Sequence, residues 1–137
     1  MAPVQNTGSA SEELKSLSKQ RINLGKSGED LAAKALQKKG LKIIIRNFRN
    51  KFGEIDIIAR DRESLVFVEV KTRCSDRFGL PEEAVTAAKQ KQIIRVASSY
   101  LSQHKLLNVP VRFDVVAITI KGGKPEINHL VSAFETD

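Results

Sequence analysis

The pattern of apolar and polar positions in the first half of the chain predicts one helix followed by three strands. Between residues 21 and 39, apolar side chains recur every three or four residues, which is the spacing of one helix face, and Gly40 suits the end of that helix. Residues 41–48 include three consecutive isoleucines and predict a first strand. Residues 53–60 and 65–72 are rich in β-branched side chains and flank four polar residues, so they predict a β-hairpin.

The second half of the chain predicts another helix and at least one more strand. Residues 81–103 have helical spacing, with a break expected near Thr86. Residues 111–120 predict the last clear strand, and residues 126–137 a short strand that leads into a final helical turn. The element order is therefore α-β-β-β-α-β. This order predicts an α/β fold with a central mixed sheet of four to five strands, flanked by helices.

Length and composition are those of one globular domain. The 137 residues are 41% hydrophobic and 28% charged, which suits a single domain over residues 21–137 after a flexible polar tail over residues 1–20. No apolar run approaches the ~18–20 residues that cross a bilayer, and no signal-peptide stretch is found, so we expect a cytoplasmic protein without a membrane partner. The net charge of +7 favours nucleic acid as a partner.

The predicted hairpin places two acidic side chains opposite each other. If the turn takes residues 61–64, the numbers of each cross-strand pair sum to about 125, so Asp56 faces Glu69 and Glu54 faces Lys71. Side chains alternate along a strand, so Asp56, Glu69 and Lys71 share one face. Two carboxylates with Cβ atoms about 4.5–5.5 Å apart repel each other unless they share a proton or bind a cation. Carboxylate oxygens are ligands that Mg²⁺ prefers. A lysine on the same face could orient a metal-bound water or stabilise negative charge on a phosphate.

Apolar side chains extend along both faces of this hairpin. The face opposite the charged residues carries Ile55, Ile57, Ala59, Val66, Val68 and Val70, and the charged face continues as Ile58 and Phe67. Such a sheet is expected to be buried between helices, with its charged end forming a site. The alternative is a solvated edge with ordinary ion pairs.

Four residues outside the hairpin are candidates for contacts with nucleic acid. Arg73 and Arg77 belong to the polar loop after the second hairpin strand, where they either contact a phosphate backbone or are simply solvated. Lys89 and Gln90 lie one turn before the buried stripe of the second helix. At least one of these two is expected to face the charged end of the sheet, and a surface position is the alternative.

Three other features do not indicate a catalytic site. Cys74 is the single cysteine and both histidines are remote in sequence, so an incidental thiol is expected rather than a nucleophile. Residues 25–27 resemble part of a phosphate-binding loop, but Gln20 stands where that motif needs glycine. Asp114 is expected to pair with Arg112 or to act as a cap rather than to bind a metal.

These residues resemble a known nuclease signature. Asp56, followed after the turn by Glu69-Val70-Lys71, resembles the motif of PD-(D/E)XK nucleases, although Ile55 stands in place of the usual proline. The element order matches the restriction-endonuclease-like core of that superfamily. Five blocks resemble the uncharacterised bacterial YraN-like family, which is similar to archaeal Holliday-junction resolvases: Gly28-Glu29, Arg46-Asn47-Phe48-Arg49, Gly53-Glu54-Ile55-Asp56, Val68-Glu69-Val70-Lys71-Thr72-Arg73 and Pro81-Glu82-Glu83-Ala84-Val85.

The resemblance implies a metal site and a reaction. Asp56, Glu69 and the backbone carbonyl of Val70 would hold Mg²⁺ or Mn²⁺, and Lys71 would assist the attacking water. Glu29 matches the acidic residue that resolvase-like proteins supply from the first helix. The implied function is a metal-dependent endonuclease acting on structured DNA, with a homodimer suited to symmetric cutting of a junction. The alternative is a protein of nuclease fold that binds nucleic acid without cutting it.

Overall fold

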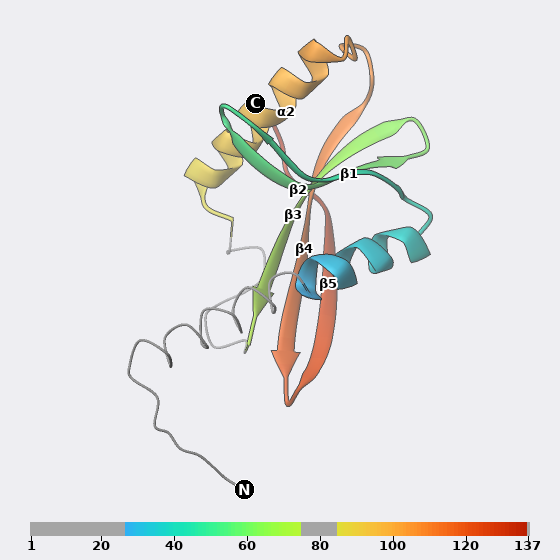
Figure 1. Cartoon of the computed structure of the whole chain (residues 1–137), viewed down its shortest axis with the longest axis vertical. Helices are drawn as coiled ribbons and strands as arrows, with labels where there is room; N and C mark the ends of the chain where they lie inside the picture. Colours follow the sequence, from blue (N-terminus) through green and yellow to red (C-terminus); the bar gives the residue numbers. More distant parts are fainter. Residues whose placement is uncertain (1–26, 75–84, 137) are drawn as a thin grey trace, which may run out of the picture.

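The computed structural model describes residues 27–74 and 85–136, in which a five-stranded sheet is flanked by helices (Figure 1). The predicted tail, Arg77 and residues 81–84 lie outside the described residues. Residues 27–38 are helical, and the elements that follow are β1 (Lys42–Asn50), β2 (Gly53–Asp61), β3 (Ser64–Arg73), α2 (Ala87–Gln103), β4 (Val111–Lys121) and β5 (Lys124–Phe134). In the described part of the chain, no helix is long and apolar enough to cross a membrane.

The strands lie in the sheet in the order of the sequence. β1, β2 and β3 are successive antiparallel neighbours, and β4 and β5 form a second antiparallel pair. β3 and β4 are parallel, and the connection between them contains α2, as a parallel crossover requires. The predicted α/β fold with a mixed sheet is therefore confirmed, and the sheet has five strands.

Two apolar clusters pack on the two faces of the sheet. The first joins α2 to the sheet and contains Ile55, Ile58, Leu65, Phe67, Val85, Ile93, Val96, Ala97, Tyr100, Phe113 and Val115. The second joins the helical residues 27–38 to the sheet and contains Ala32, Ala33, Leu36, Leu41, Ile57, Ala59, Val66, Val68, Val116 and Ile118. The hairpin is thus buried on both sides, as its apolar pattern predicts.

Ile55 lies on a different side from the one that simple alternation predicts. It packs in the cluster that contains α2, whereas Ile57 packs against the helical residues 27–38. The pairing of β1 with β2 skips Asn47 and Asp56, and Asn47 has a positive φ of 56°, so regular alternation is interrupted between Ile55 and Ile57. The nearby Gly53 is close to α2, because a Cβ atom added there would lie 2.7 Å from the Gln92 side chain.

In the second half of the chain, one predicted detail is confirmed and another is wrong. The break near Thr86 is confirmed, since Thr86 is the N-cap of α2 and its hydroxyl oxygen accepts a hydrogen bond from the Lys89 backbone at 3.1 Å. The helical turn expected after the last strand is wrong for the described residues, because β5 continues to Phe134. Gly122 and Gly123 both have positive φ and form a turn after β4. The turn reverses the chain, so that β5 pairs antiparallel with β4.

Candidate functional site

The register predicted for the β2–β3 hairpin is confirmed, but its ladder ends just before the acidic residues. Pairing runs from Asp61–Ser64 to Ile57–Val68. The next residue of β2, Asp56, instead accepts a hydrogen bond through Oδ2 from the backbone N–H of Val70 at 2.7 Å. A side chain therefore takes the place of a backbone acceptor, which holds the Asp56 carboxylate between the two strands.

The predicted pairing of Glu54 with Lys71 is wrong. Glu54 lies opposite Arg49 of β1, and its carboxylate accepts a hydrogen bond from that guanidinium at 2.8 Å. The pairing between β2 and β3 does not extend as far as Glu54, since it ends at Ile57. Lys71 remains close enough to Glu69 for its charge to favour the ionised form of that carboxyl.

Glu69 is a buried acid beside a second acid. Its side chain is 5% exposed and shares a hydrogen bond with the Asp56 carboxyl group. Burial, followed by the charge of Asp56, raises the pKa of Glu69 to about 8, against the attraction of Lys89 and Lys71. The ammonium of Lys89 lies 3.8 Å from Glu69 Oε2. At neutral pH Glu69 therefore keeps its proton unless a bound cation displaces it.

The chemistry of this pair fits a hard divalent cation. Mg²⁺ is bound in proteins by one or two carboxylates and retains several waters, so Asp56 and Glu69 suffice as side-chain ligands. A cation would also relieve the repulsion that now raises the pKa of Glu69. Among the described residues, no group of three or more His, Cys, Asp and Glu side chains is close enough to hold a metal ion. Glu29 is thus not gathered with the pair as a third ligand.

Glu29 nevertheless approaches the site from the helical residues 27–38. Burial and the charge of Asp56 raise the pKa of Glu29, while Arg46 and a hydrogen bond from Asn47 oppose that shift. The Arg46 guanidinium lies 4.0 Å from Glu29 and donates a hydrogen bond to Asp30 at 2.7 Å. β1 therefore orients this end of the helix through Arg46 and Asn47. Neither residue was a predicted site residue, because both appear in the sequence only as part of a block that resembles the family.

Gly28 lets the helix approach the sheet next to Glu29. A Cβ atom at this position would overlap Oγ1 of Thr72 on β3. The side chains of the helix start and the end of β3 are thereby held near each other.

The residues predicted to contact nucleic acid are divided by the structure. Lys89 faces the charged end of the sheet, as expected for at least one of the two α2 residues. The Gln90 side chain instead donates a hydrogen bond to the Val85 carbonyl at 3.1 Å, next to the helix start. Arg73 is half-buried at the end of β3, and Arg77 lies outside the described residues.

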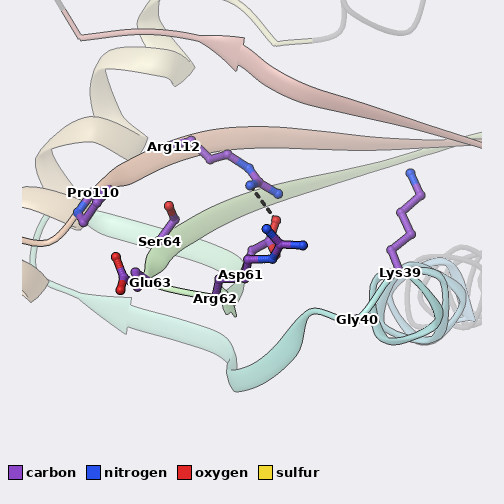
Figure 2. Close-up of a pocket in the computed structure, with 8 residues that line it drawn as sticks. All are labelled: Lys39, Gly40, Asp61, Arg62, Glu63, Ser64, Pro110 and Arg112. Atoms are coloured by element: carbon purple, nitrogen blue, oxygen red, sulfur yellow. Dashed lines mark hydrogen bonds and ion pairs between the residues drawn. The ribbon is translucent and has the colours of Figure 1, made fainter.

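A second polar feature lies at the turn of the β2–β3 hairpin, away from Asp56 and Glu69. A cavity of about 780 Å³ lies here. Figure 2 draws the residues that line it: Lys39, Gly40, Asp61, Arg62, Glu63, Ser64, Pro110 and Arg112. Arg112 points across it to Asp61, with a distance of 2.8 Å between Nη1 and Oδ2. This turn is tighter than predicted, since Asp61 and Ser64 are themselves paired.

Arg112 also binds the fully buried Asp114, so the predicted ion pair is confirmed. Its Nε lies 3.1 and 3.2 Å from the two carboxylate oxygens. Asp114 accepts further hydrogen bonds from His129 Nε2 at 2.7 Å and from the Ser132 backbone at 3.0 Å. These contacts lower the pKa of Asp114 despite its burial. The network joins β4, β5 and the hairpin turn, and we assign it to stability rather than to catalysis.

Relatives of this chain cover most of its length. A UPF0102 protein of Syntrophotalea carbinolica is 48% identical over 118 residues, which are 86% of this chain and 96% of that protein. A UPF0102 protein of Geobacter sulfurreducens is 51% identical over 113 residues, covering 82% and 88% of the two chains. The model of the uncharacterised protein family UPF0102 matches residues 28–118.

Similarity to solved structures is weaker. A repair endonuclease from Pyrococcus abyssi aligns with a TM-score of 0.40 and 17% identity, over 88% of this chain but only 42% of that chain. SfsA of Pyrococcus furiosus, solved in complex with Ca²⁺, aligns with a TM-score of 0.33 and 13% identity, over 80% of this chain and 62% of that chain. This chain thus spans less than two thirds of either protein. The sequence matches, by contrast, confirm the YraN-like resemblance: the chain belongs to the uncharacterised protein family UPF0102.

Proposed function

We propose that this protein is a divalent-metal-dependent endonuclease that hydrolyses phosphodiester bonds in structured or branched DNA. The observation that carries the proposal is the interaction of the half-buried Asp56 carboxylate with the buried Glu69 carboxyl group at the end of a strand ladder. Such a pair costs stability and is typical of a site that binds a cation. The element order and the motif resemblance support a nuclease core of the restriction-endonuclease type.

Asp56 and Glu69 would hold the cation, together with the backbone carbonyl of Val70. Mg²⁺ or Mn²⁺, when bound, activates a water and neutralises charge on the phosphate. The hydrogen bond from the Val70 N–H orients the Asp56 carboxylate before any ligand arrives. The burial of Glu69 excludes competing water from its side of the pair.

The neighbouring cations and Glu29 complete the proposed roles. Lys71 orients the attacking water, because its ammonium acts on Glu69 from the same strand. Lys89 and Arg73 contact the phosphate backbone beside the cleaved bond. Glu29 acts on the site through its interaction with Asp56, since its own position is set by Arg46 and Asn47. A homodimer would place two such sites on a symmetric junction.

A second candidate function is nucleic-acid binding without cleavage. The observation that favours it is Lys89, whose ammonium lies 3.8 Å from Glu69 and already supplies one positive charge to the pair. In that case the protein binds DNA through its net positive charge, and divalent ions do not bind at Asp56 and Glu69. Calorimetric titration with Mg²⁺ or Mn²⁺ separates the two functions, because only the nuclease loses its metal binding in the Glu69→Gln variant.

The decisive experiment is a cleavage panel of linear, flapped, forked and four-way DNA, plus RNA, with and without Mn²⁺. We expect metal-dependent cutting of branched DNA that is abolished in the Asp56→Asn, Glu69→Gln and Lys71→Ala variants. The matched control is Glu54→Gln, which removes an acid from the same strand but one that pairs with Arg49. Full activity of the Glu69→Gln variant, or equal loss of activity in Glu54→Gln, would contradict the assignment.

A further inference from the structure

A hollow between the β1–β2 turn and α2 combines apolar side chains with one guanidinium and several hydroxyl groups. Its volume is about 590 Å³, and its lining combines Phe52 and Ile94 with Arg95 and three serines of α2, Ser98, Ser99 and Ser102. None of the described residues that line it is acidic. Hydroxyl groups and a guanidinium are common donors to phosphate oxygens in nucleic-acid complexes.

Two positive charges converge on the Phe52 ring at this hollow. Lys51 Nζ lies 5.2 Å from the ring centroid, and Arg95 Cζ lies 5.1 Å from it. Each cation is attracted by the ring. Within the described part of the chain, neither cation is ion-paired with a carboxylate. Both residues are exposed, so an anion from solvent can reach them, and a bound anion would neutralise both charges.

The hollow lies within reach of a DNA strand bound at Asp56. Phe52 precedes Asp56 by four residues, which corresponds to about 13 Å along an extended strand. Along α2, Arg95 follows Lys89 by six residues, or about 9 Å, and Lys89 contacts Glu69. One strand of duplex DNA carries a phosphate every ~3.4 Å of helix axis. Taken along the DNA axis, these two separations therefore correspond to about three to four phosphates.

We propose that this hollow is a phosphate-binding subsite, in which Lys51 and Arg95 hold the DNA backbone about three to four phosphates from the cleaved bond. This inference rests on the proposed nuclease function, because it takes the Asp56–Glu69 pair as the point of cleavage. The subsite binds the backbone irrespective of base sequence. It acts on the affinity for DNA and not on the chemical step.

The test is the salt dependence of DNA binding, measured by fluorescence anisotropy without divalent ions. Each phosphate contact contributes about 0.9 to the slope of log affinity against log salt. We expect the Lys51→Ala/Arg95→Ala double variant to lose about 1.8 from the wild-type slope. Raising the salt from 50 to 200 mM would lower the DNA affinity of both proteins. The factor by which it falls would be about twelve times larger for the wild type than for the double variant. The charge-retaining Arg95→Lys variant should keep the wild-type slope.

The control and a second readout keep the subsite separate from the nuclease. Lys42→Ala removes an exposed cation at the other end of β1, where Lys42 pairs with Arg60, and it should keep the wild-type slope. In cleavage assays the double variant should raise KM and leave kcat unchanged. An unchanged slope in the double variant of a protein that cuts DNA would overturn the subsite alone. A lowered slope in a protein that cuts no DNA would overturn the nuclease while leaving the subsite as a backbone contact.

Discussion

Replacing Glu69 with glutamine should make the metal-free protein more stable at alkaline pH. The folded protein retains the Glu69 proton up to about pH 8, whereas the ordinary pKa of the group is 4.5. Between these values the folded state binds more protons than the unfolded state, so the free energy of unfolding of the wild type falls as pH rises. The difference of 3.5 pKa units corresponds to at most about 5 kcal/mol at 1.36 kcal/mol per unit.

Glutamine removes the titrating proton while keeping the shape of the side chain and a donor toward Asp56. We therefore expect the Glu69→Gln variant to show a nearly flat profile where the wild type declines. The assay is urea unfolding with a chelator present, followed by circular dichroism at pH values from 5 to 9. Glu54→Gln, whose parent residue is partly exposed and pairs with Arg49, should follow the wild type.

Divalent metal should reverse the alkaline loss of stability in the wild type only. A ligand that binds the folded state alone raises the free energy of unfolding. Adding Mg²⁺ at pH 8.5 should therefore stabilise the wild type and leave Glu69→Gln unchanged. The prediction fails if the free energy of unfolding depends on pH in the same way for the wild type and Glu69→Gln, and if metal changes neither. In that case Glu69 does not retain its proton in the folded state.

Two further predictions concern the fold. Gly28→Ala should lower the free energy of unfolding by about 1–3 kcal/mol, because the new methyl group would overlap Thr72, and adding Thr72→Ala should recover part of the loss in the same urea titration. Asp114→Asn should cost about 1–3 kcal/mol at pH 7, because Arg112 loses a charged acceptor in the core but keeps its contact with Asp61. Because the pKa of Asp114 is lowered, its contribution is present above the ordinary value of 3.8 and is lost as pH falls below it. The difference between wild type and Asp114→Asn should thus shrink in acid, and a constant difference would contradict the assignment.

The hairpin was predictable from local pattern alone. Four polar residues between two β-branched runs set where the chain turns, and the alternation of side chains then sets which residues face each other. The observed pairing of Ile57 with Val68 follows the predicted register. The neighbourhood of Asp56 and Glu69 was predictable for the same reason. The crossover between β3 and β4 followed from the helix between them.

The state of the site was decided by contacts between distant parts of the chain. Only the structure shows that the Asp56 side chain accepts a hydrogen bond from the Val70 N–H where the β2–β3 ladder ends. It also shows that Glu54 pairs with Arg49 instead of with Lys71. His129 is another case: its Nδ1 lies 2.9 Å from Lys39 Nζ, and its Nε2 binds Asp114.

Sequence by itself determined the element order, the hairpin register and the family of this protein, because each depends on neighbouring residues or on short blocks. Tertiary structure decided the raised pKa of Glu69 beside Asp56, the contact of Glu29 with β1 and the two cations on Phe52. These features depend on burial and on distances between elements that are far apart in the chain. Periodicity along the sequence carries no information about either quantity.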